Sequence, residues 1–195
     1  MTKALLIIDM LNDFVPQEGY ESKLPVTGAE TLVENIAAIK AQAEQKGYVV
    51  VYANDSHPED SEEFKLWPVH CIKGTYGAEV VEGLEPGQAQ VFEKDSLDVF
   101  TNQEFDCTMR QQGVDEFYVV GVATEYCDRA VVLGALQRGY KVNLVVDAIA
   151  GVDEIVLPDG NAVPGTKGAV ANALMEMAAA GAKPVYTARA LEELI

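Results

Sequence analysis

Short, continuous apolar runs recur along the chain. Examples are LLII at positions 5–8, VVVYA at 49–53 and FYVVGV at 117–122. Unbroken apolarity, in contrast to strict alternation, is typical of strands buried on both faces in a parallel sheet. The pattern predicts strands at Ala4–Asp9, Tyr48–Asn54, Ala89–Glu93, Glu116–Ala123, Lys141–Val146 and Pro184–Thr187.

Between these runs, apolar residues recur at helical spacing. The spacing predicts a helix over Ala29–Gly47, which closes on a glycine, and another over Asn102–Gln112. Further helices are predicted from Cys127 onward, over Lys167–Ala180 and at the end of the chain. Strands that alternate with helices indicate the α/β class. We therefore expect a three-layer α/β/α, Rossmann-like open sheet of about six mainly parallel strands, with helices on both faces.

The length of 195 residues and the hydrophobic content of 49% indicate one domain, spanning residues 1–195, with a sizeable core. We find no internal repeat and no interdomain linker. Residues 55–88 show little periodicity. Irregular segments of this length are rare in compact domains and are usually functional, so this segment is a candidate metal and substrate loop.

Acidic residues outnumber basic ones, 31 to 14, and the net charge is −17. This charge argues against nucleic acid and anionic membrane surfaces as partners. No apolar run approaches the roughly 20 residues of a membrane span, and the first residues enter a strand without a cleavable signal pattern. We expect a cytoplasmic protein with no membrane or nucleic-acid partner, and this composition also allows a homo-oligomer.

Chemically useful side chains follow five different predicted strands. They are Asp9, Asp55, Lys94, Cys127 and Asp147. In open parallel sheets, ligands bind beyond the carboxyl ends of the strands, so these residues are expected to converge on one crevice. A carboxylate, a lysine and a cysteine together form a recognisable nucleophilic set.

Cys127 lies where a strand turns into a helix, and this position favours a thiolate. In this set Asp9 can take the thiol proton and return it, while Lys94 supplies a positive charge beside the sulfur. Asp128 would raise the thiol pKa if its carboxylate faced the sulfur. Backbone amides around Val122–Cys127 are candidate donors to an oxyanion. The alternative is that Cys127 is simply a buried residue, as free cysteines usually are.

The loop offers a second candidate site. Asp55 and His57 are two residues apart, so an extended backbone places both on one face. The only other histidine, His70, lies in the same loop, and Glu62 or Glu63 lies between them. Two histidines with carboxylates suit zinc, iron or manganese, although loop histidines are often merely solvated.

Other side chains in and near the loop leave alternatives open. Phe14 and Trp67 are either satellite core residues or the walls of a pocket for a flat aromatic ligand. Three cysteines do not indicate a disulfide framework in such a chain. We expect Cys71 to serve packing, and Cys107, inside a predicted helix, to be structural.

Several motifs, in this order and with these separations, resemble nicotinamidases of the isochorismatase-like cysteine hydrolase superfamily. The matching segments are IIDMLNDF at 7–14, DSH at 55–57, WPVHC at 67–71, Lys94, and GVATEYC at 121–127. GVATEYC is specific to the superfamily, and the two histidine motifs narrow the resemblance to its metal-containing, nicotinamidase-like branch. The last third of the chain matches only in general layout.

The resemblance implies a role for each matching residue. Asp9, Lys94 and Cys127 would form the catalytic triad, and the amides of Ala123 and Cys127 the oxyanion hole, next to a cis peptide between Val122 and Ala123. One divalent ion, zinc, iron or manganese, would hold the ring nitrogen of the substrate. Its ligands would be Asp55, His57 and His70, with Glu63 as a further candidate, and the ring pocket would be lined by Phe14, Trp67, Ala123 and Tyr126.

The activity implied is hydrolysis of nicotinamide to nicotinate and ammonia through a thioester on Cys127, in NAD salvage, with pyrazinamide as a second substrate. The nearest alternative is an amidohydrolase of the same superfamily acting on another small amide or carbamoyl compound. Isochorismate hydrolysis has no use for the cysteine or the metal site. A non-catalytic binding protein would not need a nucleophile, and an enzyme using metal-bound water would leave Cys127 dispensable.

Overall fold

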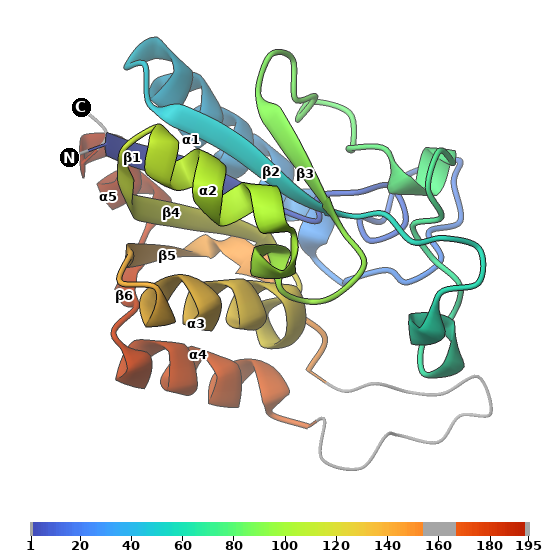
Figure 1. The fold of residues 1–195 in the computed structure, drawn as a ribbon. Coiled ribbons are helices and arrows are strands. Elements are labelled where there is room, and N and C mark those ends of the chain that lie inside the picture. The colour runs from blue at the N-terminus through green and yellow to red at the C-terminus, as the bar shows by residue number, and fades with distance from the viewer. Residues whose placement is uncertain (1, 154–166, 194–195) are drawn as a thin grey trace.

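The computed structural model describes residues 2–153 and 167–193. They form one six-stranded sheet in the order β3-β2-β1-β4-β5-β6 (Figure 1). All neighbouring pairs are parallel, so the predicted parallel sheet is confirmed. The strands are β1 (Thr2–Ile8), β2 (Val49–Asp55), β3 (Gln90–Lys94), β4 (Val114–Val122), β5 (Lys141–Ala150) and β6 (Lys183–Val185).

Helices cover both faces of the sheet, which confirms the three-layer prediction (Figure 1). On one face lie α1 (Val33–Gln45), which continues a 3-10 turn at Ala29–Leu32, and α5 (Thr187–Glu193). The other face carries α2 (Gln103–Gln111), α3 (Arg129–Gln137) and α4 (Ala169–Ala180).

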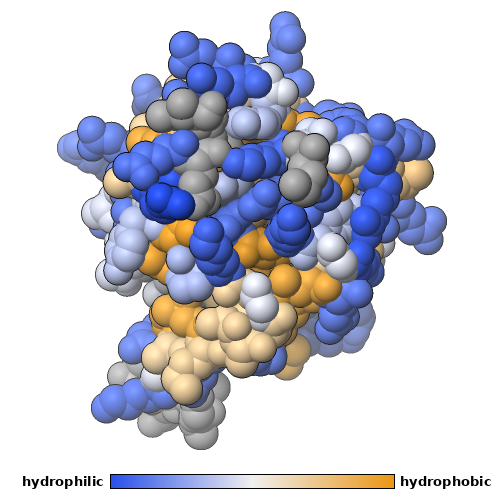
Figure 2. Space-filling model, turned by 90° about the vertical axis from the view of Figure 1, so that its left-hand side faces the viewer, coloured by the Kyte–Doolittle hydropathy of each residue, from blue (hydrophilic) through white to orange (hydrophobic). Residues whose placement is uncertain are grey.

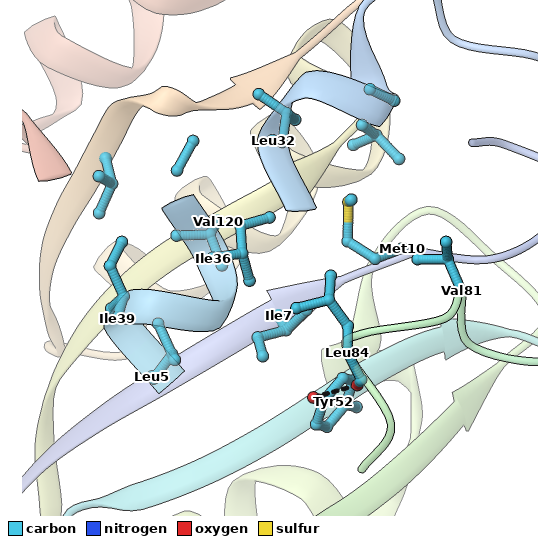
Figure 3. Close-up of a cluster of buried hydrophobic side chains, with 14 of the residues drawn as sticks. Leu5, Ile7, Met10, Leu32, Ile36, Ile39, Tyr52, Val81, Leu84 and Val120 are labelled. Atoms are coloured by element: carbon cyan, nitrogen blue, oxygen red, sulfur yellow. Dashed lines mark hydrogen bonds between the residues drawn. The ribbon is translucent and has the colours of Figure 1, made fainter. Parts of the chain in front are cut away.

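The core consists of two hydrophobic layers, one on each side of the sheet. β1 contributes to both, because Leu5 and Ile7 face the α1 side while Leu6 and Ile8 face the opposite side. This arrangement explains the unbroken apolar run, since a strand with two buried faces needs apolar residues at every position. Figure 3 shows the layer under α1, where the buried Tyr52 hydroxyl donates to the Leu84 carbonyl at 2.6 Å.

The predicted strand ends differ from the observed ones at β5. A register shift between Val119 and Gly121 of β4 extends β5 through Asp147 to Ala150. Asp147 therefore does not follow the strand, and the prediction that it does was wrong. Its carboxylate accepts hydrogen bonds from the Thr187 amide and hydroxyl at 2.7 and 2.9 Å, which caps α5. Thr187 accordingly begins α5, whereas the pattern had placed it at the end of β6.

Two further segments are organised differently from the sequence pattern. A π-helical turn, Thr124–Asp128, carries Cys127, and α3 begins only after it. The 55–88 loop contains 3-10 turns at Glu62–Lys65 and Tyr76–Ala78, and a parallel bridge joins His57 to Ile72. The glycine- and proline-containing stretch that runs to Gly165, for which the sequence predicts no helix or strand, lies mostly outside the described residues.

Figure 2 shows the face at the amino ends of the strands, which is opposite the end where the 55–88 loop lies. Hydrophilic side chains cover much of this face, with hydrophobic colour gathered in its lower part. Ala178, Ala179 and Ala180 at the end of α4 are exposed. No helix in the described part of the chain has the length and apolarity to cross a membrane. The single-domain interpretation stays a prediction.

The ends of β1 and β4 approach each other closely at Gly121. This glycine has a φ of +126°, and a Cβ built on it would lie 2.0 Å from the Ile8 carbonyl oxygen. Only glycine relieves both constraints, because it lacks the Cβ and tolerates positive φ. Since Asp9 directly follows Ile8, the contact also places the first candidate site residue against the end of β4.

Substituting Gly121→Ala should therefore lower the free energy of unfolding by roughly 3 kcal/mol, because the side chain adds a backbone clash to an unfavourable φ. Denaturant unfolding measures the loss. Gly139→Ala is the matched control: Gly139 has a φ of +82° but open space around its Cβ position. It should cost only about 1–2 kcal/mol. Equal losses in the two variants would show that the close contact carries no cost of its own.

Candidate active site and metal site

The carboxyl ends of β1, β2, β3 and β4 bring the predicted triad together at the point where the strand order reverses. Lys94 lies at the centre of this group. Its Nζ donates to Asp9 Oδ2 at 2.8 Å, to Asp55 Oδ1, and to Cys127 Sγ at 3.4 Å. Its side chain has no exposed surface. One buried ammonium thus joins the candidate base, the candidate nucleophile and a candidate metal ligand.

Hydrogen bonds fix both the main chain and the side chain of Asp9. Asp9 has a φ of 50°, a conformation that asparagine and aspartate adopt more readily than most residues. Its amide donates to the Ala53 carbonyl at 3.0 Å, and its Oδ1 accepts from the Asp55 amide at 2.7 Å. The carboxylate is therefore held by β2 on one oxygen and by Lys94 on the other.

Burial dominates the ionisation of Cys127, the candidate nucleophile. It raises the pKa of the Cys127 thiol well above its ordinary value, and Lys94 opposes this shift while Asp9 and Asp55 add to it. Complete burial beside two carboxylates thus opposes the thiolate that the strand–helix junction and Lys94 favour. The thiol needs a partner that accepts its proton during attack.

Asp9 is suited to accept that proton. Burial and the neighbouring Asp55 raise the pKa of Asp9 to about 6, although Lys94 lowers it. Burial on its own would lower the pKa of Lys94, but Asp55 and Asp9 raise it well above its ordinary value. Lys94 is thus a permanent cation, and Asp9 is a carboxyl group that can exchange a proton near neutral pH.

The turn between β4 and α3 carries the residues predicted for the oxyanion hole. The peptide between Val122 and Ala123 is cis, as the resemblance implies. The Ala123 carbonyl accepts from the amides of Tyr126 and Asp128 at 2.9 and 3.2 Å. The role of the Ala123 and Cys127 amides toward an oxyanion stays a prediction.

Asp55, His57 and His70 come together as a candidate metal site. Their ligand atoms lie within 4.8 Å of one another. His57 Nε2 is 3.6 Å and His70 Nε2 is 4.0 Å from Asp55 Oδ2. Among the described residues, the buried His57 Nε2 has no hydrogen-bond partner, which is the expected state of a nitrogen whose lone pair binds an ion. Two imidazoles and one carboxylate fit a divalent transition metal.

Glu63, the fourth candidate ligand, is not part of the group formed by Asp55, His57 and His70. Glu63 groups instead with His57 and Asp95, although it lines the same cavity as His70. Glu62 points outward, with 85% of its side chain exposed, and pairs with Lys65. Glu62 is therefore not a ligand candidate, whereas Glu63 stays one at the rim of the site.

His57 is surrounded by negative charge. Burial alone would lower its pKa, but the neighbouring carboxylates of Asp55 and Asp95 raise the pKa to about 9. His70 differs, because its Nδ1 contacts the Pro68 carbonyl at 2.7 Å. A carbonyl only accepts, so that nitrogen carries the hydrogen and leaves Nε2 as the lone-pair donor.

A cavity of about 280 Å³ opens onto both groups. Aromatic residues form part of its wall, as predicted. The rings of Trp67 and Tyr126 pack edge to face, with their centroids 5.1 Å apart. The Phe14 ring lies 5.3 Å from His70. The full lining is Asp9, Phe14, Leu24, Pro25, Val26, Asp55, Glu63, Trp67, His70, Leu97, Ala123, Tyr126, Cys127 and Val152.

Sequence reasoning missed part of this wall. The segment at 24–26, Leu97 and Val152 reach the cavity from three separate loops, and no periodicity marks them. It also missed Asp13, whose Oδ2 accepts from the Cys71 amide at 2.7 Å and so fixes the residue after His70. The position of Asp13 inside the IIDMLNDF motif was an available signal.

The other cysteines have different environments. Cys71 is buried in the core layer under α1, which confirms a packing role. Cys107 lies in α2 as predicted, and its side chain is exposed, so the expected structural role is not one of packing in the core. The helix pattern had placed Cys107 correctly along the chain without indicating which way its side chain faces.

Comparison with known proteins decides the family. The sequence pattern of the Isochorismatase domain family matches residues 3–189. The chain belongs to the isochorismatase family. The nicotinamidase of Escherichia coli (strain K12) is 30% identical to this chain. The alignment, 223 residues long with its gaps, covers 98% of this chain and 97% of that protein. The nicotinamidase/pyrazinamidase of Mycobacterium tuberculosis is 34% identical over 77% of this chain and 87% of that protein.

Solved structures of the isochorismatase type agree with this fold. The pyrazinamidase of Pyrococcus horikoshii in complex with zinc is 31% identical, with a TM-score of 0.81 over 95% of this chain and 99% of that one. A protein of L. infantum in complex with nicotinate is 26% identical, with a TM-score of 0.82 over 96% of this chain and 93% of that one. This isochorismatase-family chain is a nicotinamidase-like amidohydrolase.

Asp128, next to the candidate nucleophile Cys127 of this isochorismatase-family chain, is a buried carboxyl group. It has no exposed surface, and neither of its oxygens has a hydrogen-bond partner among the described residues. Burial first, and then the charges of Asp9 and Glu125, raise its pKa well above the ordinary value. The folded environment therefore favours the neutral form of Asp128.

Asp128 should make the protein less stable as the pH rises. Its folded pKa exceeds the unfolded value of about 3.9, so its stabilising contribution is complete below that value and is lost as the pH rises toward the folded pKa. The variant Asp128→Asn carries no titrating group at this position. Between pH 5.5 and 7, its free energy of unfolding should therefore rise relative to that of the wild type, by up to about 1.4 kcal/mol per pH unit.

Urea unfolding at several pH values measures this difference. Glu59→Gln, which removes an exposed carboxylate, is the control. Its free energy of unfolding should change with pH in the same way as that of the wild type. If Asp128→Asn also ran parallel to the wild type, Asp128 would be ionised in the folded protein.

Proposed function

We propose that this protein is a metal-containing nicotinamidase that converts nicotinamide and water to nicotinate and ammonia. The observation that carries the proposal is the buried Lys94 ammonium, which contacts Asp9, Cys127 and Asp55 at once. A cysteine, a proton acceptor and a fixed cation are the parts needed for acyl transfer. The third contact places the candidate metal site next to this reactive group.

Cys127 acts as the nucleophile in the proposed reaction. Its sulfur attacks the carboxamide carbon while Asp9 takes the thiol proton. The Ala123 and Cys127 amides stabilise the tetrahedral oxyanion. When the carbon–nitrogen bond breaks, Asp9 returns the proton and ammonia leaves, with a thioester remaining on the sulfur. Water then attacks the thioester, Asp9 takes its proton and passes it to the departing sulfur, and nicotinate is released.

Asp55, His57 and His70 would hold one divalent ion, with Glu63 at the rim. When bound, the ion supplies a Lewis-acid position for the ring nitrogen of the substrate. We favour zinc, since the donor set suits it and a pyrazinamidase of this fold was solved in complex with zinc. Iron and manganese fit the same donors.

The cavity supports a small, flat and uncharged substrate. Phe14, Trp67 and Tyr126 offer ring faces and edges, while Leu97 and Val152 add aliphatic surface. Three acidic residues line the cavity: Asp9, Asp55 and Glu63. The other ionisable side chains in its lining are those of His70, Cys127 and Tyr126. The aromatic wall suits a flat ring, which favours nicotinamide and pyrazinamide over carbamoyl compounds without a ring. The nicotinate complex of a related fold supports the same choice.

Replacing Cys127 by alanine should abolish the reaction. We expect ammonia release from nicotinamide to fall by roughly 10³-fold or more, because no other group near Asp9 can form the thioester. The matched control is Cys107→Ala, which removes an exposed thiol on α2 and should keep wild-type activity. Mass spectrometry of the quenched wild type should detect the acyl group on Cys127.

Two results would contradict this proposal in different ways. Full activity in Cys127→Ala would mean that metal-bound water is the nucleophile. Absence of ammonia release from nicotinamide by fresh, metal-replete wild type would reject the substrate, and a panel containing pyrazinamide and N-carbamoyl amino acids would then separate the alternatives.

Removing the metal should affect substrates that have a ring nitrogen more than those that lack one. After chelation, we expect nicotinamide hydrolysis to be lost and to return when zinc is added, while slow benzamide hydrolysis changes much less. His70→Ala should resist this rescue, whereas Val69→Ala, which alters the exposed neighbouring side chain, should behave like the wild type. Elemental analysis checks the metal content. Undiminished nicotinamide hydrolysis by metal-free protein would rule out the proposed role of the ion.

A further inference from the structure

A second carboxylate contacts His57 from the side opposite Asp55. Asp95 Oδ1 lies 2.5 Å from His57 Nδ1, and the Ser61 hydroxyl donates to the same oxygen at 3.0 Å. The His57 side chain is completely buried, whereas 48% of the Asp95 side chain is exposed. A half-exposed carboxylate thus reaches inward to a buried ring and is held there by a loop hydroxyl.

This contact determines which nitrogen of His57 carries a hydrogen. A carboxylate only accepts, so Nδ1 donates to Asp95. In the neutral ring, Nε2 then presents its lone pair, and it lies 3.6 Å from Asp55 Oδ2. Nε2 is also the buried nitrogen that has no hydrogen-bond partner in the described part of the chain. The two nitrogens therefore have distinct tasks, one directed at Asp95 and the other at the candidate ion.

The fold builds Asp95 into this position. Asp95 directly follows Lys94, the last residue of β3, and the Ser56 amide donates to the Lys94 carbonyl at 3.0 Å. The end of β3 is thereby tied to the chain segment that leads into His57. Asp95 is not among the residues that line the cavity, so it lies behind His57 and does not reach the substrate.

The three candidate ligands are supported differently. Asp55 Oδ1 is held by the Lys94 ammonium, and His70 Nδ1 by the neutral Pro68 carbonyl. His57 is the histidine that a carboxylate supports. A carboxylate that accepts from a ligand imidazole fixes the orientation of the ring and makes its other nitrogen a stronger donor.

We propose that Asp95 is a positioning residue that holds His57 in the Nδ1–H form and so strengthens metal binding through Nε2. This inference rests on the metal site of the proposed function. Loss of such a partner typically weakens metal binding by about 10–100-fold. Ser61 assists by fixing the carboxylate, so its removal should have a smaller effect.

The test measures metal binding directly, without substrate. Metal-stripped wild type, Asp95→Asn, Asp95→Ala and Ser61→Ala are titrated with Zn²⁺ against a competing chelator. Asp60→Asn is the matched control, since it removes an exposed carboxylate from the same loop next to Ser61. We expect zinc affinity about 10–100-fold lower in both Asp95 variants, a smaller loss in Ser61→Ala and no change in Asp60→Asn.

Cobalt provides a second readout that a general loss of stability would not produce. Co²⁺ loaded at saturating concentration should give a shifted absorption spectrum in Asp95→Ala, because the His57 ring is no longer fixed. Asp95→Glu should recover part of the zinc affinity if a carboxylate on Nδ1 is what matters. Circular dichroism of each metal-free variant establishes that the fold is retained.

The outcomes separate the inference from the proposed function. If the wild type binds no zinc, the proposed metal site fails. If it binds one zinc and the Asp95 variants bind it equally well, the metal site stands and the inference fails. Binding of two zinc ions by the wild type, with one lost in Asp95→Asn, would make Asp95 a ligand of a second site formed with His57 and Glu63, which would also overturn the positioning role.

Discussion

The buried ammonium of Lys94 is the interaction on which the rest of the site depends. Without it, Asp9 and Asp55 would be two carboxylates in contact inside the protein, and both would be driven toward their neutral forms. The cation allows them to stay close while they serve different purposes. It keeps the two oxygens of Asp55 distinct as well, since one faces Lys94 and the other faces the histidines.

The strand order explains how one cation can reach all these groups. Asp9, Asp55 and Lys94 come from three adjacent strands, and Cys127 follows the strand on the other side of β1. Parallel pairing brings all four carboxyl ends to one edge, and the reversal of strand order at β1 and β4 opens the crevice there. Gly121 then permits the last close approach, next to Asp9.

The sequence was most informative where a physical constraint acts locally. Strands buried on both faces require unbroken apolar runs, so β1, β2 and β4 were predictable. The convergence of Asp9, Lys94 and Cys127 beyond the ends of strands was predictable as well. Asp147 was misplaced because a register shift in the neighbouring pairing extends β5, and no local pattern signals such a shift. Asp95 and Leu97 were missed because their roles depend on loops that only the folded chain brings together.

The position of β3 in the sheet has a consequence for how activity is lost. In the described part of the chain, β3 is an edge strand of five residues that pairs with β2 alone, yet its end supplies both Lys94 and Asp95. Edge elements open at lower free energy than the core. Local fraying of β3 would remove the cation and release His57 while the hydrophobic layers remain intact, so inactivation on warming should precede global unfolding. The lifetime of the proposed activity would therefore be limited by an edge strand.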